Sequence, residues 1–158
     1  MTALSLLHTV VTAANAAVGV TPRQVVWRKN KARLYRYERQ TPATQRTPVF
    51  LVLPLINRAY ILDLRPGQSF VEHLLQQGHE VYLLDWGVPG DEDRGLDLTA
   101  LITRYLARAV RVASRQSGGP LTLLGYCIGG VLATCFAALD AGGERLVKNL
   151  VLFTTPID

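Results

Sequence analysis

The stretch Leu121-Thr-Leu-Leu-Gly-Tyr-Cys-Ile-Gly-Gly130 decides the fold that the sequence predicts. Its first four residues form an apolar run that is typical of a strand covered on both faces. The run passes directly into Gly125-Tyr-Cys127-Ile-Gly129, in which a nucleophile is flanked by glycines two residues away on either side. A nucleophile on a sharp turn between a strand and a helix needs such small neighbours, because bulky side chains would collide there. We therefore predict a strand, a nucleophilic turn and a helix in immediate succession.

Cys127 is the residue of this turn that can carry chemistry. The dipole of the following helix favours a thiolate at its N-terminus, and the backbone N–H of Ile128 is expected to point to where an oxyanion would form on an attacked carbonyl. Gly130 is expected to let the helix pack close to the strand. The alternative is a buried structural cysteine, which leaves the flanking glycines unexplained. For Cys135, two turns into the helix, a place in the core is the expectation.

Outward from this stretch, buried strands and helices alternate along the chain. Continuous apolar runs predict strands, and apolar residues at helical spacing predict helices with one buried face. The predicted strands are 49–53, 80–84, 121–124 and 146–153; the predicted helices are 69–77, a long helix that Asp97 caps, with its apolar face at 98, 101, 102, 105, 109 and 112, and 131–139. This alternation predicts a parallel sheet with helices on both faces.

A predicted hairpin precedes the alternating part. Residues 24–28 and 32–38 are rich in β-branched and aromatic side chains, and charged residues recur along the second segment, so we expect a hairpin with one solvated face. No internal repeat or domain boundary is visible, which predicts one domain over residues 21–158 after a lead-in of residues 1–20. The lead-in has no Lys or Arg before its apolar run, so it is expected to be a short amphipathic helix or an irregular segment and not a signal peptide.

The composition of the chain argues against several classes of function. The chain has 158 residues, of which 49% are hydrophobic and 18% charged, and a net charge of +5. The basic residues are scattered, so a solvated basic face explains the charge better than a nucleic-acid partner. A stripe of Arg104, Arg108, Arg111 and Arg115 along the long helix is open to two interpretations, a solvated face or a contact with coenzyme A phosphates, and the first is favoured. The two cysteines form neither a zinc motif nor a disulfide framework, which favours a reduced, cytoplasmic setting, and no run of apolar residues is long enough to predict a transmembrane helix.

Several segments together resemble one enzyme family. They are Tyr35-Arg-Tyr37, Leu55-Ile-Asn57-Arg-Ala-Tyr60-Ile-Leu-Asp63-Leu64, Val81-Tyr-Leu-Leu-Asp85-Trp86-Gly87, the turn around Cys127, and Asn149-Leu-Val-Leu-Phe-Thr-Thr155-Pro-Ile-Asp158. In this order they are similar to the polyhydroxyalkanoate synthases over residues 20–158, and the short lead-in resembles the classes that work with a second subunit. The resemblance implies an α/β-hydrolase fold of which this sequence holds the N-terminal part, as far as the strand after the nucleophile.

The resemblance also implies a mechanism. Cys127 would take a 3-hydroxyacyl group from coenzyme A as a thioester, which the hydroxyl of a growing polyester would then attack. Ile128 would supply one oxyanion donor, and the loop near Ile56 or Asn57 the second, although Asn57 is equally well explained as a turn residue. No cofactor and no metal are implied beyond the substrate 3-hydroxyacyl-CoA. The implied setting is the surface of a cytoplasmic polyester granule, with a second synthase subunit and a homo-oligomer as partners.

A cysteine nucleophile of this type needs a histidine base that an acid orients, and both follow the nucleophile in this fold. No histidine follows Cys127; His8, His73 and His79 precede it and are expected at the surface. The acids after Cys127 are Asp140, Glu144 and Asp158, none where the family places its acid, and Asp85 is expected to be structural. We therefore expect the domain to be truncated before its catalytic acid and histidine, and to hold only the acyl-accepting half of a site.

Two other functions stay open. A thioesterase or ester hydrolase of the same fold could use the same cysteine turn, and it would release a free hydroxy acid instead of a polymer. A non-catalytic remnant or an accessory granule protein would explain the missing histidine.

Overall fold

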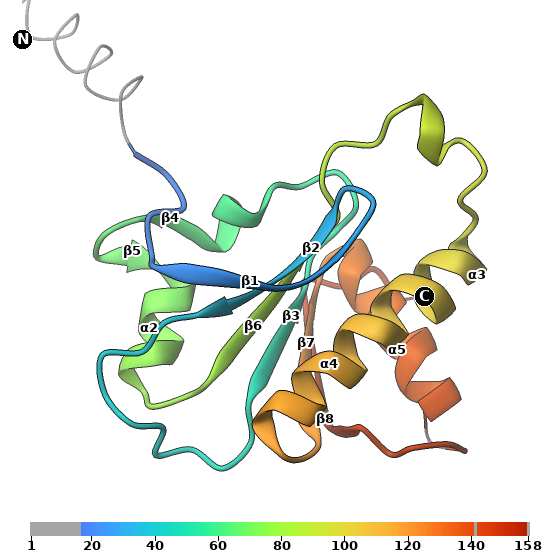
Figure 1. Cartoon of the computed structure of the whole chain (residues 1–158). Coiled ribbons are helices and arrows are strands. Elements are labelled where there is room, and N and C mark those ends of the chain that lie inside the picture. The colour runs from blue at the N-terminus through green and yellow to red at the C-terminus, as the bar shows by residue number, and fades with distance from the viewer. Residues whose placement is uncertain (1–16, 141, 158) are drawn as a thin grey trace, which may run out of the picture.

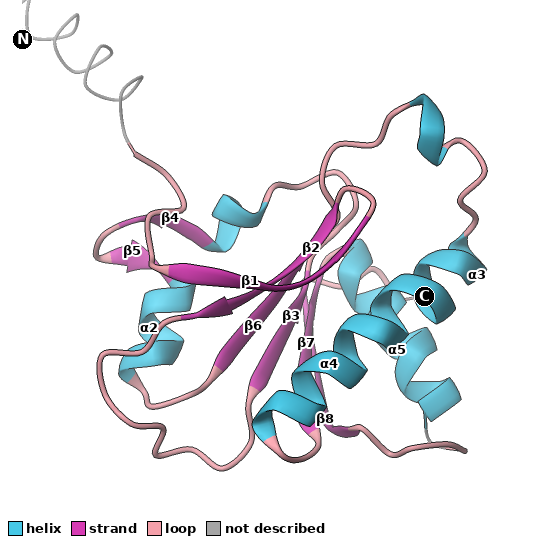
Figure 2. Cartoon of the chain, viewed as in Figure 1, coloured by secondary structure: helices cyan, strands magenta, loops and turns pink. Residues whose placement is uncertain are grey.

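The computed structural model describes residues 17–140 and 142–157, and the predicted lead-in therefore lies largely outside the described residues. A six-stranded sheet in the order β1-β2-β6-β3-β7-β8 forms the centre of the fold (Figure 1). Its strands are β1 (Arg23–Lys29), β2 (Ala32–Tyr37), β3 (Val49–Val52), β6 (Val81–Asp85), β7 (Leu121–Tyr126) and β8 (Val147–Phe153). The helices are α2 (Phe70–Gln76), α3 (Leu98–Ala100), α4 (Ala107–Ser117) and α5 (Ile128–Asp140) (Figure 2).

The four strands of the alternating part are parallel, as predicted. β3 lies between β6 and β7 and is parallel to both, and β8 is parallel to β7. β1 and β2 form the predicted antiparallel hairpin, and β2 joins the sheet antiparallel to β6. The carboxyl ends of β6, β3, β7 and β8 therefore meet at one edge of the sheet, the edge at which α/β sheets place their sites.

Helices cover both faces of the sheet, which confirms the predicted layers. One core lies between the sheet and α4 and α5, and contains Phe50, Leu84, Leu123 and Phe136. The second lies on the α2 side, and contains Leu51, Leu83 and Val71. Figure 1 shows α2 on one side of the sheet and α4 and α5 on the other. Neighbouring residues of β3, β6 and β7 thus point into different cores, which is why these three strands are largely apolar.

The buried face of the long helix differs in part from the predicted apolar face. Asp97 caps it as predicted, by accepting a hydrogen bond from the N–H of Ala100 at 2.6 Å. Between α3 and α4, however, residues Leu101–Leu106 form a π-helix. The wider turn of a π-helix shifts the face that looks to the core. The buried positions are 100, 102, 105, 106, 107, 109, 110, 113 and 114, whereas Leu98 is 53% exposed.

The single solvated face that we predicted for the hairpin is wrong for β2. Leu34 is buried in the core under α4 and α5, and Tyr35 and Tyr37 are buried in the core on the α2 side. β2 is an inner strand between β1 and β6, so both of its faces are covered. The solvated strand is the edge strand β1, where Val25 is 43% exposed.

β8 also differs from the prediction, which placed it among the strands covered on both faces. It lies at the edge of the sheet and pairs only with β7 in the described part of the chain. α5 packs against it, yet Val151, Leu152 and Phe153 are 43%, 39% and 48% exposed. An apolar sequence is therefore no guarantee that both faces of a strand are covered within this chain.

A second, two-stranded sheet was not predicted. It pairs β4 (Asp63–Arg65) with β5 (Gln68–Ser69). The Asp63 carboxylate, fully buried, accepts hydrogen bonds from the Thr21 hydroxyl at 2.6 Å, the Thr21 N–H at 3.2 Å and the Ser69 hydroxyl at 2.7 Å. This network ties the start of β1 to the loop that leads from β3 to α2.

Candidate active site

Cys127 stands alone between two elements, with β7 ending at Tyr126 and α5 beginning at Ile128. Its φ is +53°, in the left-handed region that residues with a side chain rarely adopt. Two hydrogen bonds hold this conformation: the Cys127 N–H donates to the Phe153 carbonyl at 2.9 Å, and the Gly130 N–H donates to the Cys127 carbonyl at 2.8 Å. The sharp, strained turn that the sequence predicts is therefore present, with the half-buried thiol at the start of a helix.

The glycines of the turn are required by close contacts. A Cβ on Gly125 would lie 2.7 Å from the Gly130 nitrogen, and a Cβ on Gly129 would lie 2.7 Å from the Leu53 carbonyl carbon. A Cβ on Gly130 would meet the Thr155 side chain. Backbone cannot retreat from such contacts as a flexible side chain can. Helix α5 thus begins pressed against the ends of β3 and β7.

The residues predicted to donate hydrogen bonds to an oxyanion are Ile128 and, in the loop after β3, Ile56 or Asn57. Ile128 is the first residue of α5, and the first N–H groups of a helix have no carbonyl partner within the helix. The Ile128 side chain is 43% exposed. In the loop after β3, the Asn57 N–H donates to the Pro54 carbonyl at 3.3 Å. The backbone N–H of Asn57 therefore closes a turn, which supports the interpretation of Asn57 as a turn residue. Ile56 lies at the tip of the same loop, with 89% of its surface exposed.

Trp86 connects the neighbouring strand ends. Its indole Nε1–H donates to the Leu53 carbonyl at 2.8 Å, and its side chain is buried. Since Gly129 packs against the same residue, Leu53 lies between the end of β6 and the start of α5. The Asp85 carboxylate before Trp86 accepts the Gly87 N–H at 3.0 Å and so shapes the turn. This contact is the structural role expected for Asp85.

Aromatic rings gather beside the turn, which the sequence analysis did not foresee. The rings of Tyr126 and Phe153 are 5.6 Å apart, and those of Phe70 and Phe153 are stacked at 6.3 Å. These residues come from β7, β8 and α2, so no spacing in the sequence relates them. They give the side of the turn that faces α2 an apolar surface.

The acids that follow Cys127 have structural partners. Asp140, which is buried, accepts the Val147 N–H at 2.9 Å and so joins the end of α5 to β8. Glu144 pairs with Arg111 at 2.6 Å. Asp158 lies outside the described residues. Of the arginine stripe, Arg104, Arg108 and Arg115 are exposed, as a solvated face requires.

The histidines of the described residues lie on α2 and directly before β6. His73 is exposed on α2, and His79 precedes β6 at the amino edge of the sheet, opposite to the edge of Cys127. The surface position expected for His79 is wrong: it is half-buried, and its Nδ1 is buried without a hydrogen-bond partner among the described residues. Next to His79, the Gly78 carbonyl accepts a hydrogen bond from the Thr44 N–H at 3.1 Å, so the segment at Thr44 lies against this loop. His8 lies outside the described residues.

The described residues contain neither a cluster suited to a metal ion nor a helix suited to span a membrane. In residues 17–140 and 142–157, no three His, Cys, Asp or Glu side chains come together in a way that could hold a metal ion. No helix within those same ranges has the length and apolar character needed to cross a membrane.

Two family models match the chain. Residues 8–74 match the model described as "Poly-beta-hydroxybutyrate polymerase (PhaC) N-terminus", and residues 61–158 match the model of the alpha/beta hydrolase fold. The second match spans the strand, turn and helix around Cys127.

Curated relatives agree with these models. A poly(3-hydroxyalkanoate) polymerase subunit PhaC from Haloferax mediterranei is 45% identical over 89% of this chain and 28% of its own length. The PhaC subunit of Synechocystis sp. is 39% identical over 89% of this chain and 37% of its own length. The chain thus spans well under half of the relatives that it matches. Among solved structures, the Francisella virulence factor BioJ superposes with a TM-score of 0.64 at 13% identity, over 98% of this chain and 50% of that one, which speaks for the fold alone.

Proposed function

The chain belongs to the α/β-hydrolase fold family, and its sequence matches the N-terminal part of the PhaC polymerases; from this premise we propose that Cys127 accepts a 3-hydroxyacyl group from coenzyme A. The observation that carries the proposal is the conformation of Cys127, which holds φ +53° at the start of α5 between glycines packed against backbone. Strain of this kind is kept at functional sites. A merely structural cysteine would need neither the turn nor the glycines.

The proposed reaction has two transfers. The Cys127 thiolate attacks the carbonyl carbon of the substrate thioester, and the C–S bond to coenzyme A breaks, so that coenzyme A leaves as its thiolate. The Ile128 N–H stabilises the oxyanion of the intermediate, with the loop at Ile56 supplying the second donor. The hydroxyl of the polyester chain then attacks the new thioester, loses its proton and frees the Cys127 sulfur.

A single acylation needs only the thiolate form of Cys127, whereas repeated turnover also needs a base. Activation of a cysteine or a hydroxyl by histidine requires hydrogen-bond reach. His79 lies at the amino edge of the sheet, opposite to Cys127, and His73 is exposed on α2. We propose that Cys127 and its oxyanion donors form the acyl-accepting half of the site, and that repeated turnover draws its acid and base from residues outside this half.

The names of the relatives suggest the assembly in which this chain works. They are named polymerase subunits, and we propose that this chain likewise works in an assembly with further synthase polypeptide, including copies of itself. On this proposal the assembly acts in the cytoplasm at the surface of the polyester that it extends.

Acylation of the purified 158-residue chain tests the proposal. The chain is incubated with 3-hydroxybutyryl-CoA, digested, and examined by mass spectrometry for an acyl group on either cysteine. We expect the adduct on Cys127 and its loss in Cys127→Ala, whereas Cys135→Ala keeps it. Equal labelling of both cysteines, or none on Cys127 in a folded chain, contradicts the proposal. A hydrolase of the same fold would instead release free 3-hydroxybutyrate continuously.

A further inference from the structure

A small apolar cavity of about 170 Å³ lies at the carboxyl edge of the sheet. Its walls come from the β1–β2 turn, the residues after β3 and β6, the loop before α3, and the π-helical segment. The side chains that form them are Ala32, Leu55, Trp86, Leu96, Leu101 and Tyr105. Nothing in the proposed acyl transfer to Cys127 accounts for a hollow at this position.

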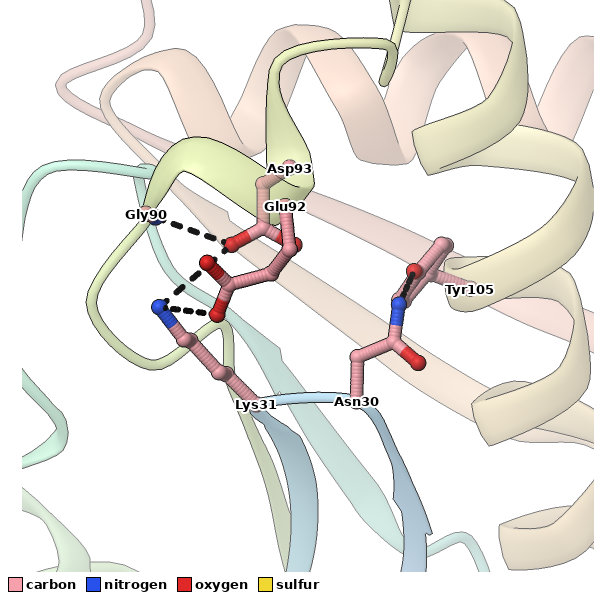
Figure 3. A network of polar contacts seen from close by, with 6 residues as sticks. All are labelled: Asn30, Lys31, Gly90, Glu92, Asp93 and Tyr105. Atoms are coloured by element: carbon pink, nitrogen blue, oxygen red, sulfur yellow. Dashed lines mark hydrogen bonds and ion pairs between the residues drawn. The ribbon is translucent and has the colours of Figure 1, made fainter.

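The rim of the cavity is polar, but its polar groups are paired with one another (Figure 3). The Asn30 side-chain amide donates to the Tyr105 hydroxyl at 2.8 Å. The Lys31 ammonium lies 2.6 Å from Glu92 and 3.7 Å from Asp93, and Asp93 also accepts the Gly90 N–H at 3.0 Å. The hydrogen bond and ion pair raise the pKa of Lys31 and lower the pKa of Glu92, so both stay charged at neutral pH.

This pairing decides the chemistry of the occupant. An anionic group would meet the Asp93 carboxylate, and any charged group would lose its hydration against walls that are mostly apolar. An ordered water needs two to four polar partners, and the walls behind the rim are mostly apolar. The volume is close to that of an apolar cavity of about 150 Å³ that holds a benzene-sized molecule. An uncharged aliphatic group of about five or six carbons therefore fits.

Leu53 connects the cavity with the Cys127 turn. Trp86 lines the cavity and donates to the Leu53 carbonyl, and the backbone of Gly129, two residues after Cys127, packs against the same Leu53. We propose that the cavity binds the short aliphatic substituent of an acyl substrate. The identity of this ligand rests on the proposed function, whereas the existence of an aliphatic site does not.

Binding of 1-pentanol to the purified 158-residue chain tests the site without any turnover. Trp27 and Trp86 are the two tryptophans of the sequence, so a Trp27→Phe background leaves one indole N–H signal in the NMR spectrum. We expect this Trp86 signal to shift and saturate as 1-pentanol is added. Each methylene removed from the alcohol should weaken binding about fourfold, as the burial of a methylene group predicts.

Filling variants separate the cavity from the rest of the surface. Leu101→Phe adds volume at the wall, and we expect it to weaken 1-pentanol binding at least about tenfold, because a packed cavity has no room for the alcohol. Leu98→Phe is the matched control: Leu98 is three residues earlier, is 53% exposed and does not line the cavity. Leu96→Phe fills the cavity from the loop and serves if Leu101→Phe does not fold. An unmoved Trp86 signal, or equal binding in the control and both filling variants, overturns the proposal.

The same variants distinguish two outcomes: a cavity that binds no aliphatic group, and a Cys127 that is not acylated. 1-Pentanol should still bind to Cys127→Ala, because the thiol is not part of the cavity. If binding is found but Cys127 is never acylated, the aliphatic site stands and its substrate identity falls. If Cys127 is acylated, Leu101→Phe should slow acylation by 3-hydroxyhexanoyl-CoA more than by 3-hydroxybutyryl-CoA, and equal slowing contradicts the assignment of the cavity to the acyl substituent.

Discussion

The indole Nε1–H of Trp86 donates a hydrogen bond of 2.8 Å to the carbonyl oxygen of Leu53. The two residues stand one position beyond the ends of the parallel strands β6 and β3, where the backbone ladder of the sheet has stopped. The bond therefore replaces a ladder bond with a side chain and satisfies a carbonyl that would otherwise be buried without a partner. It also fixes the residue against which Gly129 packs.

Trp86→Phe should lower the free energy of unfolding by about 2 kcal/mol. The substitution leaves the fully buried Leu53 carbonyl without its donor, and an unsatisfied buried acceptor costs about 1 to 3 kcal/mol. Urea unfolding followed by circular dichroism measures the change. Trp27→Phe, a substitution of the same kind on the edge strand β1, should cost less. Equal costs would mean that ring volume and not the hydrogen bond matters.

Gly129→Ala should destabilise the chain by about 3 kcal/mol or prevent folding, since the new methyl group would overlap backbone atoms at the end of β3. Gly95→Ala is the control: no atom lies within 4 Å of the position of its new methyl group, and a surface change of this kind stays within about 0.5 kcal/mol. Thermal unfolding of the two variants side by side provides the comparison. A Gly129→Ala chain as stable as Gly95→Ala would contradict the packing described for α5.

Asp63→Asn should destabilise the chain by about 1 to 3 kcal/mol, because an amide puts an N–H group where the carboxylate accepts from Thr21 or Ser69. Asp91→Asn is the matched control, since Asp91 pairs only with exposed Arg94 in the described part of the chain, and such surface pairs contribute little. A double-mutant cycle with Ser69→Ala tests the network. If Ser69→Ala costs as much in Asp63→Asn as in the parent chain, the two residues are not coupled.

Stability should fall between pH 10 and pH 12 in part because of Tyr37. Burial raises the pKa of Tyr37 to about 12 against an ordinary value of 10.0, although Arg23 opposes the shift. Below pH 10 the hydroxyl is neutral in both states. Between the two values the unfolded chain loses the proton and the folded chain keeps it, so stability is lost as pH rises, by about 2 to 3 kcal/mol in total.

Tyr37→Phe removes this contribution, so its unfolding free energy should decline less steeply over the same pH range. Urea unfolding at pH 9.5, 10.5 and 11.5 measures the slope. Part of the decline should remain in the variant, because burial and a hydrogen bond to Glu80 also raise the pKa of Tyr82. Parallel declines in the parent and the variant would show that Tyr37 ionises alike in both states.

The sequence predicted where the strands, helices and the Cys127 turn lie in the chain better than it predicted which of their faces are buried. The turn at Cys127, the cap at Asp97 and the parallel strands all depend on residues that are neighbours in the chain, so their pattern is visible in it. The predicted face of the long helix was right at positions 102, 105 and 109, which are buried, and wrong at Leu98, which is 53% exposed. The π-helical segment between α3 and α4 is not visible in the sequence pattern. β8 ends in the apolar run Leu150–Phe153, yet its place at the edge of the sheet leaves Phe153 48% exposed.

The sequence by itself determined that a cysteine stands on a strained turn between a buried strand and a helix, because a glycine two residues away on either side is a local steric requirement. Only the tertiary structure decided what surrounds that turn. The Trp86–Leu53 hydrogen bond, the aromatic contacts of Phe153 and the cavity at Leu101 each join segments that are distant in the chain. Such contacts follow from which surfaces meet when the layers pack, and no spacing along the sequence encodes them.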